Sequence, residues 1–276
     1  MSPVRDTVSD EEVARYRRDG FVVLGGLLDG AALRRWREVF EAAAAGRRSR
    51  LPLGDEEYGE FYSSVEEYYD RVFTQRMNCW MTSEAARTLV LDERLGRLAA
   101  DLAGVDGVRL WLDQVLVKEP YANPTAFHLD VPYWSFSSDD ALTFWIALSD
   151  ATLQNGCMCY LPGSHLLRRY DNIQIGREIG SLFDVYPEWR EVEPTPCPVR
   201  AGDAVVHNGL TAHGAGANMT PRRRFAVTVA FMPDGSRFNG QQDMLPGSYV
   251  QTLAVGDVLD DDRYNPLVFS RRRPAP

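Results

Sequence analysis

The sequence has no long apolar run and no N-terminal signal pattern. None of its 276 residues falls in a stretch of about 18 or more apolar residues, so no transmembrane helix is predicted. The first residues also lack a charged segment followed by an apolar one, which is typical of a secretory signal. We therefore expect a cytoplasmic protein that does not span a membrane.

Cysteines are few, and acidic residues outnumber the cationic ones. The four cysteines (Cys79, Cys157, Cys159 and Cys197) are too few and too scattered for a disulfide framework. We expect Cys157 and Cys159 to be buried strand thiols, because their neighbours are apolar. Lysines and arginines number 30 against 39 acidic residues, and the net charge of −9 argues against binding to nucleic acid or anionic membranes. A small molecule is the expected partner, and the oligomeric state stays open.

The N-terminal part predicts helices around one short strand. A capping box at residues 9–12 begins a helix that Gly20 ends, and residues 21–24 have the pattern of a strand. Asp29 is placed to cap a second helix, whose apolar stripe predicts packing on a sheet. Residues 92–104 predict a further helix with glycine at its end.

Residues 46–82 are rich in aromatic residues with acidic residues between them, and they follow no single periodicity. One interpretation is a segment that lines a pocket. The other is a helix whose aromatic stripe covers the core, and the sequence favours this second interpretation.

Strand patterns dominate from residue 108 onward. Alternating or continuously apolar residues predict strands at residues 110–118, 142–148, 157–161, 203–207 and 224–232. In the last of these, small and polar residues alternate with bulky ones, so the small face should look into a cavity. A helix is expected near residues 176–183, between the third and fourth of these strands.

No internal repeat and no low-complexity linker divides the chain. We therefore expect a single domain over residues 1–276, mainly β with flanking helices. Its parts are a helical N-terminal part at about 9–104, a β core at about 108–232 and a C-terminal tail at 233–276.

His128 and Asp130 are candidates for a metal site. Residues separated by one position lie on the same face of a strand, so this imidazole and this carboxylate could bind one ion together. Only three other histidines could add a third ligand: His165, His207 and His213. We prefer His213, because Arg224 follows it by 11 residues at the start of the inward-facing strand. His165 follows a Pro-Gly-Ser turn and is expected to be structural, and His207 remains an alternative.

Two histidines and one carboxylate on one face of a metal, with other positions open, are typical of non-haem Fe(II) oxygenases. The open positions admit a chelating cosubstrate and dioxygen. An acidic cosubstrate also needs a nearby cation, and Arg224 can meet a carboxylate with a two-pronged hydrogen bond.

These residues also carry a resemblance to a known family, over roughly residues 9–232. His128-Leu129-Asp130, Pro162-Gly163-Ser164-His165, Gly202-Asp203 and the run from His213 to Asn218 followed by Arg224 resemble the phytanoyl-CoA dioxygenase family of Fe(II)/2-oxoglutarate oxygenases. The resemblance implies a double-stranded β-helix, the cupin-like jelly-roll. It implies Fe(II) on His128, Asp130 and His213, with 2-oxoglutarate and O2 as cosubstrates.

The resemblance implies further roles. Arg224 would bind the distal carboxylate of 2-oxoglutarate, with Thr143 placing a hydroxyl beside it. Gln114 and Lys118 share a strand face and are candidate cosubstrate contacts. Asn218 is expected to shape a turn. Tyr133, Trp134 and Phe136 are candidates to wall the substrate cavity, or else pack within a loop.

The expected reaction is hydroxylation of a small molecule with release of succinate and CO2. Asp130 disfavours halogenation, because halogenating relatives carry a small residue there. Desaturation, epimerisation or ring formation by the same oxidant stays open, as does a jelly-roll protein that binds metal or ligand without turnover. No extended basic patch suits the phosphates of coenzyme A, so we favour a secondary-metabolite substrate over an acyl-CoA.

Overall fold

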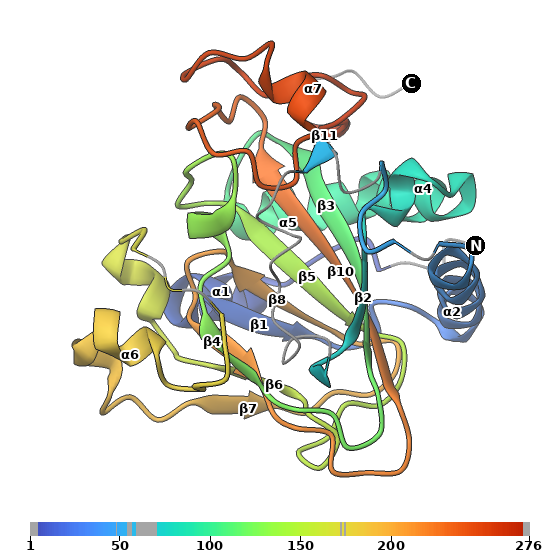
Figure 1. Cartoon of the computed structure of the whole chain (residues 1–276), viewed down its shortest axis with the longest axis vertical. Helices are drawn as coiled ribbons and strands as arrows, with labels where there is room; N and C mark the ends of the chain where they lie inside the picture. The colour runs from blue at the N-terminus through green and yellow to red at the C-terminus, as the bar shows by residue number, and fades with distance from the viewer. Residues whose placement is uncertain are drawn as a thin grey trace.

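The computed structural model describes residues 5–47, 49–53, 57–58, 71–171, 173 and 175–272. Within these residues, helices near the N-terminus pack on the outer face of a large antiparallel sheet, and a smaller sheet lies across from its inner face (Figure 1). No helix in this part of the chain combines the length and the apolar character needed to cross a membrane.

Three helices on the outer face begin at the caps that the sequence predicts, and two of them end at the predicted glycines. α1 (Asp10–Asp19) starts at a capping box in which Ser9 and Glu12 bind each other's backbone amides, and it ends at Gly20 with φ of 84°. α2 (Gly30–Ala45) starts at Asp29, which accepts hydrogen bonds from two backbone amides. The other helical segments of this part are η3 (Cys79–Met81), α4 (Glu84–Val90) and α5 (Glu93–Ala103).

The larger sheet contains seven strands in the described residues, in the order β1-β8-β5-β10-β3-β11, with β2 also paired to β3. Their bounds are β1 (Phe21–Leu24), β2 (Thr74–Met77), β3 (Gly107–Lys118), β5 (Leu142–Ala147), β8 (Ala204–Asn208), β10 (Arg224–Pro233) and β11 (Leu267–Ser270). The smaller sheet has the order β4-β9-β6-β7. Its strands are β4 (Thr125–His128), β6 (Met158–Tyr160), β7 (Thr195–Cys197) and β9 (His213–Ala215). The protein thus has the predicted jelly-roll fold.

The two faces of β10 explain how the sheet separates core from cavity. Phe225 and Phe231 point outward into the core shared with the helices, and burying each side chain stabilises the fold by about 1.5–3 kcal/mol. Arg224 and Thr228, on the other face, line a cavity between the sheets. The prediction of a small and polar inner face is confirmed.

Two sequence-based expectations need correction. The helix expected near 176–183 is wrong: α6 spans only Leu182–Val185, followed by η6 (Pro187–Trp189). Gly176 and Gly180 weaken helix formation there, and the cluster around Leu182 packs against β4 instead. In the C-terminal tail, β11 joins the larger sheet, and α7 (Gly247–Val250) follows a loop that lines the cavity.

The second correction concerns residues 46–82. Phe73, Gln75 and Met77 line the cavity, and β2 pairs with β3 rather than forming a helix. The pocket interpretation therefore holds for these residues, while Phe61, Tyr62, Tyr68 and Tyr69 lie outside the described residues. Two further short helices in the described residues are η4 (Val131–Tyr133) and η5 (Ser164–Leu167). The single-domain boundaries stay a prediction.

Candidate metal centre

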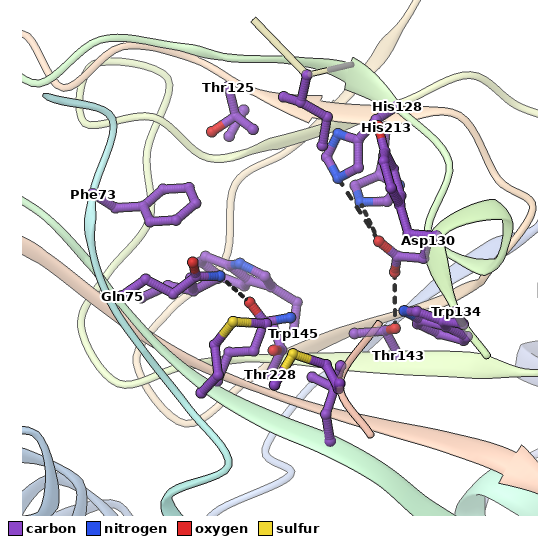
Figure 2. A pocket seen from close by; sticks show the side chains of 18 of the residues that line it. Phe73, Gln75, Thr125, His128, Asp130, Trp134, Thr143, Trp145, His213 and Thr228 are labelled. Atoms are coloured by element: carbon purple, nitrogen blue, oxygen red, sulfur yellow. Dashed lines mark hydrogen bonds and ion pairs between the residues drawn. The ribbon is translucent and has the colours of Figure 1, made fainter. Parts of the chain in front are cut away.

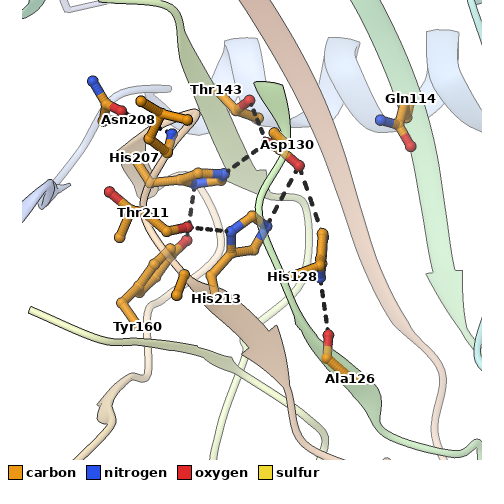
Figure 3. A network of polar contacts seen from close by, with 12 residues as sticks. Gln114, Ala126, His128, Asp130, Thr143, Tyr160, His207, Asn208, Thr211 and His213 are labelled. Atoms are coloured by element: carbon orange, nitrogen blue, oxygen red, sulfur yellow. Dashed lines mark hydrogen bonds and ion pairs between the residues drawn. The ribbon is translucent and has the colours of Figure 1, made fainter. Parts of the chain in front are cut away.

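His128, Asp130 and His213 meet at one point between the sheets. His128 ends β4 and His213 begins β9, and the two residues are direct partners across these strands. Oδ1 of Asp130 lies 3.7 Å from Nε2 of each histidine. One ligand atom from each residue lies within 4.8 Å of the others, so the three side chains could hold one metal ion (Figure 3).

The backbone orients both imidazoles toward this point. Nδ1 of His128 lies 2.9 Å from the carbonyl oxygen of Ala126, and Nδ1 of His213 lies 2.9 Å from that of Thr211. Each Nδ1–H can therefore donate to a carbonyl, which leaves the Nε2 lone pair for a metal.

The electrostatics fit a metal site. Burial, helped by the neighbouring imidazoles, lowers the pKa of His128 and of His213 to about 4, so both rings are neutral at physiological pH. Burial alone would raise the pKa of Asp130, but the adjacent His213 and the hydrogen bond from His207 hold it well below its usual value. Two neutral imidazoles and one carboxylate are the donor set of non-haem Fe(II) sites, so these residues fit iron.

The second oxygen of Asp130 has its own partners, which sequence reasoning missed. Oδ2 accepts a hydrogen bond from the Thr143 hydroxyl at 3.0 Å and lies 3.2 Å from Nε2 of His207. The hydroxyl of Tyr160 lies 3.2 Å from the other ring nitrogen of His207 (Figure 3). The only sequence signal for His207 was its place among four histidines, at the end of a predicted strand.

Arg224 and Lys118 form a buried cationic pair. They are direct partners on β10 and β3. The guanidinium carbon of Arg224 lies 4.8 Å from the centroid of the Trp145 ring, and Nη1 donates to the carbonyl of Gly156 at 3.1 Å. Nε of Arg224 has no partner among the described residues. Burial lowers the pKa of Arg224 to about 10, and burial followed by Arg224 itself lowers that of Lys118 to about 7. An anion would compensate both charges.

Most of the other residues predicted to contact cosubstrate or substrate line the cavity between the sheets. Gln114 and Thr143 line the cavity, but Thr143 contacts Asp130, so its role beside the cosubstrate carboxylate stays a prediction. Tyr133 and Trp134 line the cavity too. Phe136 is fully buried, packs edge-on against Trp111 at 5.0 Å between centroids, and lies outside the set of described residues that line the cavity.

Two motif residues have structural contacts, as the sequence predicts. Nε2 of His165 lies 3.1 Å from the carbonyl oxygen of Arg17. The Asn218 amide donates to the carbonyls of Lys118, Glu119 and Arg222 at 3.3, 2.9 and 2.7 Å, which closes the turn before β10.

The triad and Arg224 line one cavity of about 640 Å³. Lys118 lies behind this wall, and its amine donates to the carbonyl of Asn123 at 2.7 Å. Figure 2 shows the triad on one side of it and Gln75, Trp145 and Thr228 on the other. Much of the remaining wall is aromatic or contains sulfur. These residues are Phe73, Met77, Tyr133, Trp134, Met158 and Met244.

Comparison with known proteins agrees with this geometry. The family model described as phytanoyl-CoA dioxygenase matches residues 16–226. The crystal structure of the non-heme alpha ketoglutarate dependent carbocyclase SnoK from nogalamycin biosynthesis is 29% identical, covers 97% of this chain and 100% of its own, and has a TM-score of 0.78. The epimerase SnoN in complex with Fe3+, alpha ketoglutarate and nogalamycin RO is 30% identical, with 94% and 98% coverage and a TM-score of 0.73.

A curated relative is the probable alpha-ketoglutarate-dependent hypophosphite dioxygenase of Stutzerimonas stutzeri, which is 32% identical over 151 residues. This match spans 52% of each chain, so the chain matches only about half the length of that relative. The family match, by contrast, extends from α1 into β10 and includes the triad and Arg224. The protein belongs to the phytanoyl-CoA dioxygenase family and is an Fe(II)/2-oxoglutarate-dependent dioxygenase.

Proposed function

We propose that this dioxygenase hydroxylates a small, largely apolar molecule of the secondary-metabolite type and releases succinate and CO2. The observation that carries the proposal is the cavity, which joins His128, Asp130 and His213 to a wall of aromatic and methionine side chains. Such a wall recognises apolar rings and keeps water away from the reacting centre.

The chain's own residues supply binding and orientation. His128, Asp130 and His213 would hold Fe(II), and Arg224 would bind the distal carboxylate of 2-oxoglutarate with Lys118 beside it. When bound, iron and 2-oxoglutarate would supply, with dioxygen, an oxidant able to attack an unactivated C–H bond. His207 and Thr143 would keep Asp130 turned so that one oxygen remains for the metal.

The surface charges favour this substrate class over an acyl-CoA. Arg223 pairs with Glu41 at 2.7 Å, and Arg272 pairs with Asp106 at 2.8 Å. Arginines that already face carboxylates are poor candidates for binding the phosphates of coenzyme A.

Other outcomes of the same oxidant form the alternative. The similar proteins SnoK and SnoN are named a carbocyclase and an epimerase, so ring formation or epimerisation by this chain has specific support. Desaturation belongs to the same group. The product distinguishes these reactions, since hydroxylation adds one oxygen atom, ring formation and desaturation remove a pair of hydrogen atoms, and epimerisation leaves the mass unchanged.

The test begins without oxygen. Adding Fe(II) and then 2-oxoglutarate should produce a visible charge-transfer band, and a compound library should then be screened for perturbation of that band. Compounds that perturb it should, in air, increase succinate formation and yield an oxidised product. A protein without the band, or with succinate formation that does not depend on Fe(II), would contradict the proposal. His213→Ala is the matched negative control.

A further inference from the structure

Three uncharged polar side chains line the cavity on the side opposite the metal triad. Gln75 comes from β2, Gln114 from β3 and Thr228 from β10, and Thr228 is the direct cross-strand partner of Gln114. Figure 2 shows Gln75 and Thr228 across the cavity from His128 and Asp130. We call these three residues the amide centre.

The hydrogen bonds of the amide centre are incomplete. The Gln75 amide donates to Oε1 of Gln114. Oε1 of Gln75 and Oγ1 of Thr228 have no partner in the described part of the chain, although Gln75 is only 8% exposed and Thr228 only 5%. Buried polar atoms are nearly always paired, because an unpaired one has lost its water without compensation. Polar atoms that line a cavity in this state are suited to a ligand.

The unpaired groups specify what that ligand must offer. Whichever way the two amides are turned, their mutual hydrogen bond uses one carbonyl and one N–H, so one carbonyl acceptor and further N–H donors remain. Thr228 adds a hydroxyl that can donate or accept. None of the three side chains is charged, so the amide centre matches a neutral edge that carries a donor beside an acceptor.

The amide centre is separate from the cationic pair. Arg224 faces Lys118, Ala226 faces Leu116, and Thr228 faces Gln114 along the same two strands. Thr228 therefore lies four positions along the strand from Arg224, which is about 13 Å of backbone. Apolar Leu116 lies between the two polar groups on the cavity wall.

The neighbours of the amide centre are flat or adaptable apolar side chains. Trp145 is the cross-strand partner of Thr228, Met77 is that of Gln114, and both line the cavity. We infer that the amide centre binds a flat, largely apolar substrate through an edge on which a hydroxyl or N–H lies beside a carbonyl, so that another part of the molecule faces the metal. This inference rests on the proposed function and names the substrate class of that site.

The test uses two probes that differ in one donor. Phenanthridinone is a flat neutral molecule whose lactam edge has an N–H beside a carbonyl, and N-methylphenanthridinone lacks the donor. Binding is measured by titration calorimetry on the protein with Fe(II) and 2-oxoglutarate in the absence of oxygen. The lactam should bind at least about tenfold more tightly than its N-methyl analogue. Equal affinities, or no binding of the lactam up to its solubility, would overturn the inference.

Two variants test whether the amide centre is what distinguishes the lactam from its N-methyl analogue. Gln114→Leu and Thr228→Val should each bring the affinity ratio close to one. Thr228→Val removes a hydroxyl that has no partner among the described residues, so the Tm of this variant should stay unchanged or rise by about 2–4 °C. A lowered Tm would show that the hydroxyl is structural and would overturn its assignment to a ligand. Thr125→Val, on the opposite wall of the same cavity, is the matched control and should keep the discrimination.

The charge-transfer band separates failure of this inference from failure of the proposed function. Gln114→Leu and Thr228→Val should both keep the charge-transfer band and its dependence on 2-oxoglutarate concentration. If Gln114→Leu weakens 2-oxoglutarate binding instead, Gln114 belongs to the cosubstrate site, and only the inference fails. If the unaltered protein shows no band, the proposed function itself fails.

Discussion

His207 Nε2 lies 3.2 Å from Oδ2 of Asp130, while the other carboxylate oxygen is the one nearest to His128 and His213. The two oxygens of the Asp130 carboxylate therefore have different surroundings. Oδ1 is available to a metal, and Oδ2 is held by other side chains of the protein. Outer partners of this kind fix the orientation of a ligand and tune its affinity for the metal. We therefore propose that His207 positions Asp130 and does not itself bind the metal.

Substitution of the two histidines should separate these roles. His213→Ala should abolish Fe(II) binding and turnover, because it removes one of three ligands. His207→Ala should weaken Fe(II) binding by about 10–100-fold without abolishing it. Anaerobic Fe(II) titration measures both effects, and His165→Ala, which loses only a contact to the Arg17 carbonyl, is the control. Full Fe(II) affinity in His213→Ala would move the ligand role to another histidine.

Arg224 should control the requirement for 2-oxoglutarate. Arg224→Ala removes a buried guanidinium, so we expect a loss of about 2–5 kcal/mol in cosubstrate binding, which raises the 2-oxoglutarate concentration needed by at least about thirtyfold. Fe(II) affinity should change little. The neighbouring Arg223→Ala, which removes only a surface pair with Glu41, is the matched control. Unchanged 2-oxoglutarate kinetics in Arg224→Ala would exclude it from the site.

Lys118 should make 2-oxoglutarate binding depend on pH. Burial, and then Arg224, lower its pKa to about 7 in the free protein, so the amine is charged below and neutral above that pH. A carboxylate favours the charged form, so binding above pH 7 should take up a proton, and affinity should fall as pH rises from about 6.5 to about 8.5. Calorimetry in buffers of different ionisation enthalpy measures this uptake. Lys118→Met should show none, and equal uptake in this variant would assign the proton to another group.

The segment at 166–198 should become protected when the site fills. Ile173 and Ile175 line the cavity, and the Tyr133 hydroxyl donates to the carbonyl of Ile173, so the segment contacts the cavity wall. Trypsin cleavage after the exposed Arg168 and Arg190 should slow on addition of Fe(II), 2-oxoglutarate and a substrate found by the screen. Cleavage after Arg263, outside the segment, should not change. Equal rates at all sites would show that the segment does not close over the cavity.

Local patterns in the sequence predict a large part of the fold. The capping box at Ser9 and the strand at Phe21 follow from neighbouring residues alone, and both are confirmed. The prediction of a helix near 176–183 was wrong, because packing around Leu182, rather than the helix propensity of neighbouring residues, decides the conformation of that segment. The pairing of β11 with β3 was also missed, since it joins residues far apart in the chain and leaves no periodic signal.

By itself, the sequence determined the chemical nature of the site. His128, Asp130, His213 and Arg224 could be selected because histidines are few and because metal and carboxylate binding demand particular side chains. Only the tertiary structure decided which residues support them. His207 reaches Asp130 from 77 positions away, and Gln75, Gln114 and Thr228 meet through pairing of three strands. Such contacts depend on the register between distant strands. This register cannot be predicted from the alternation of side chains within a single strand.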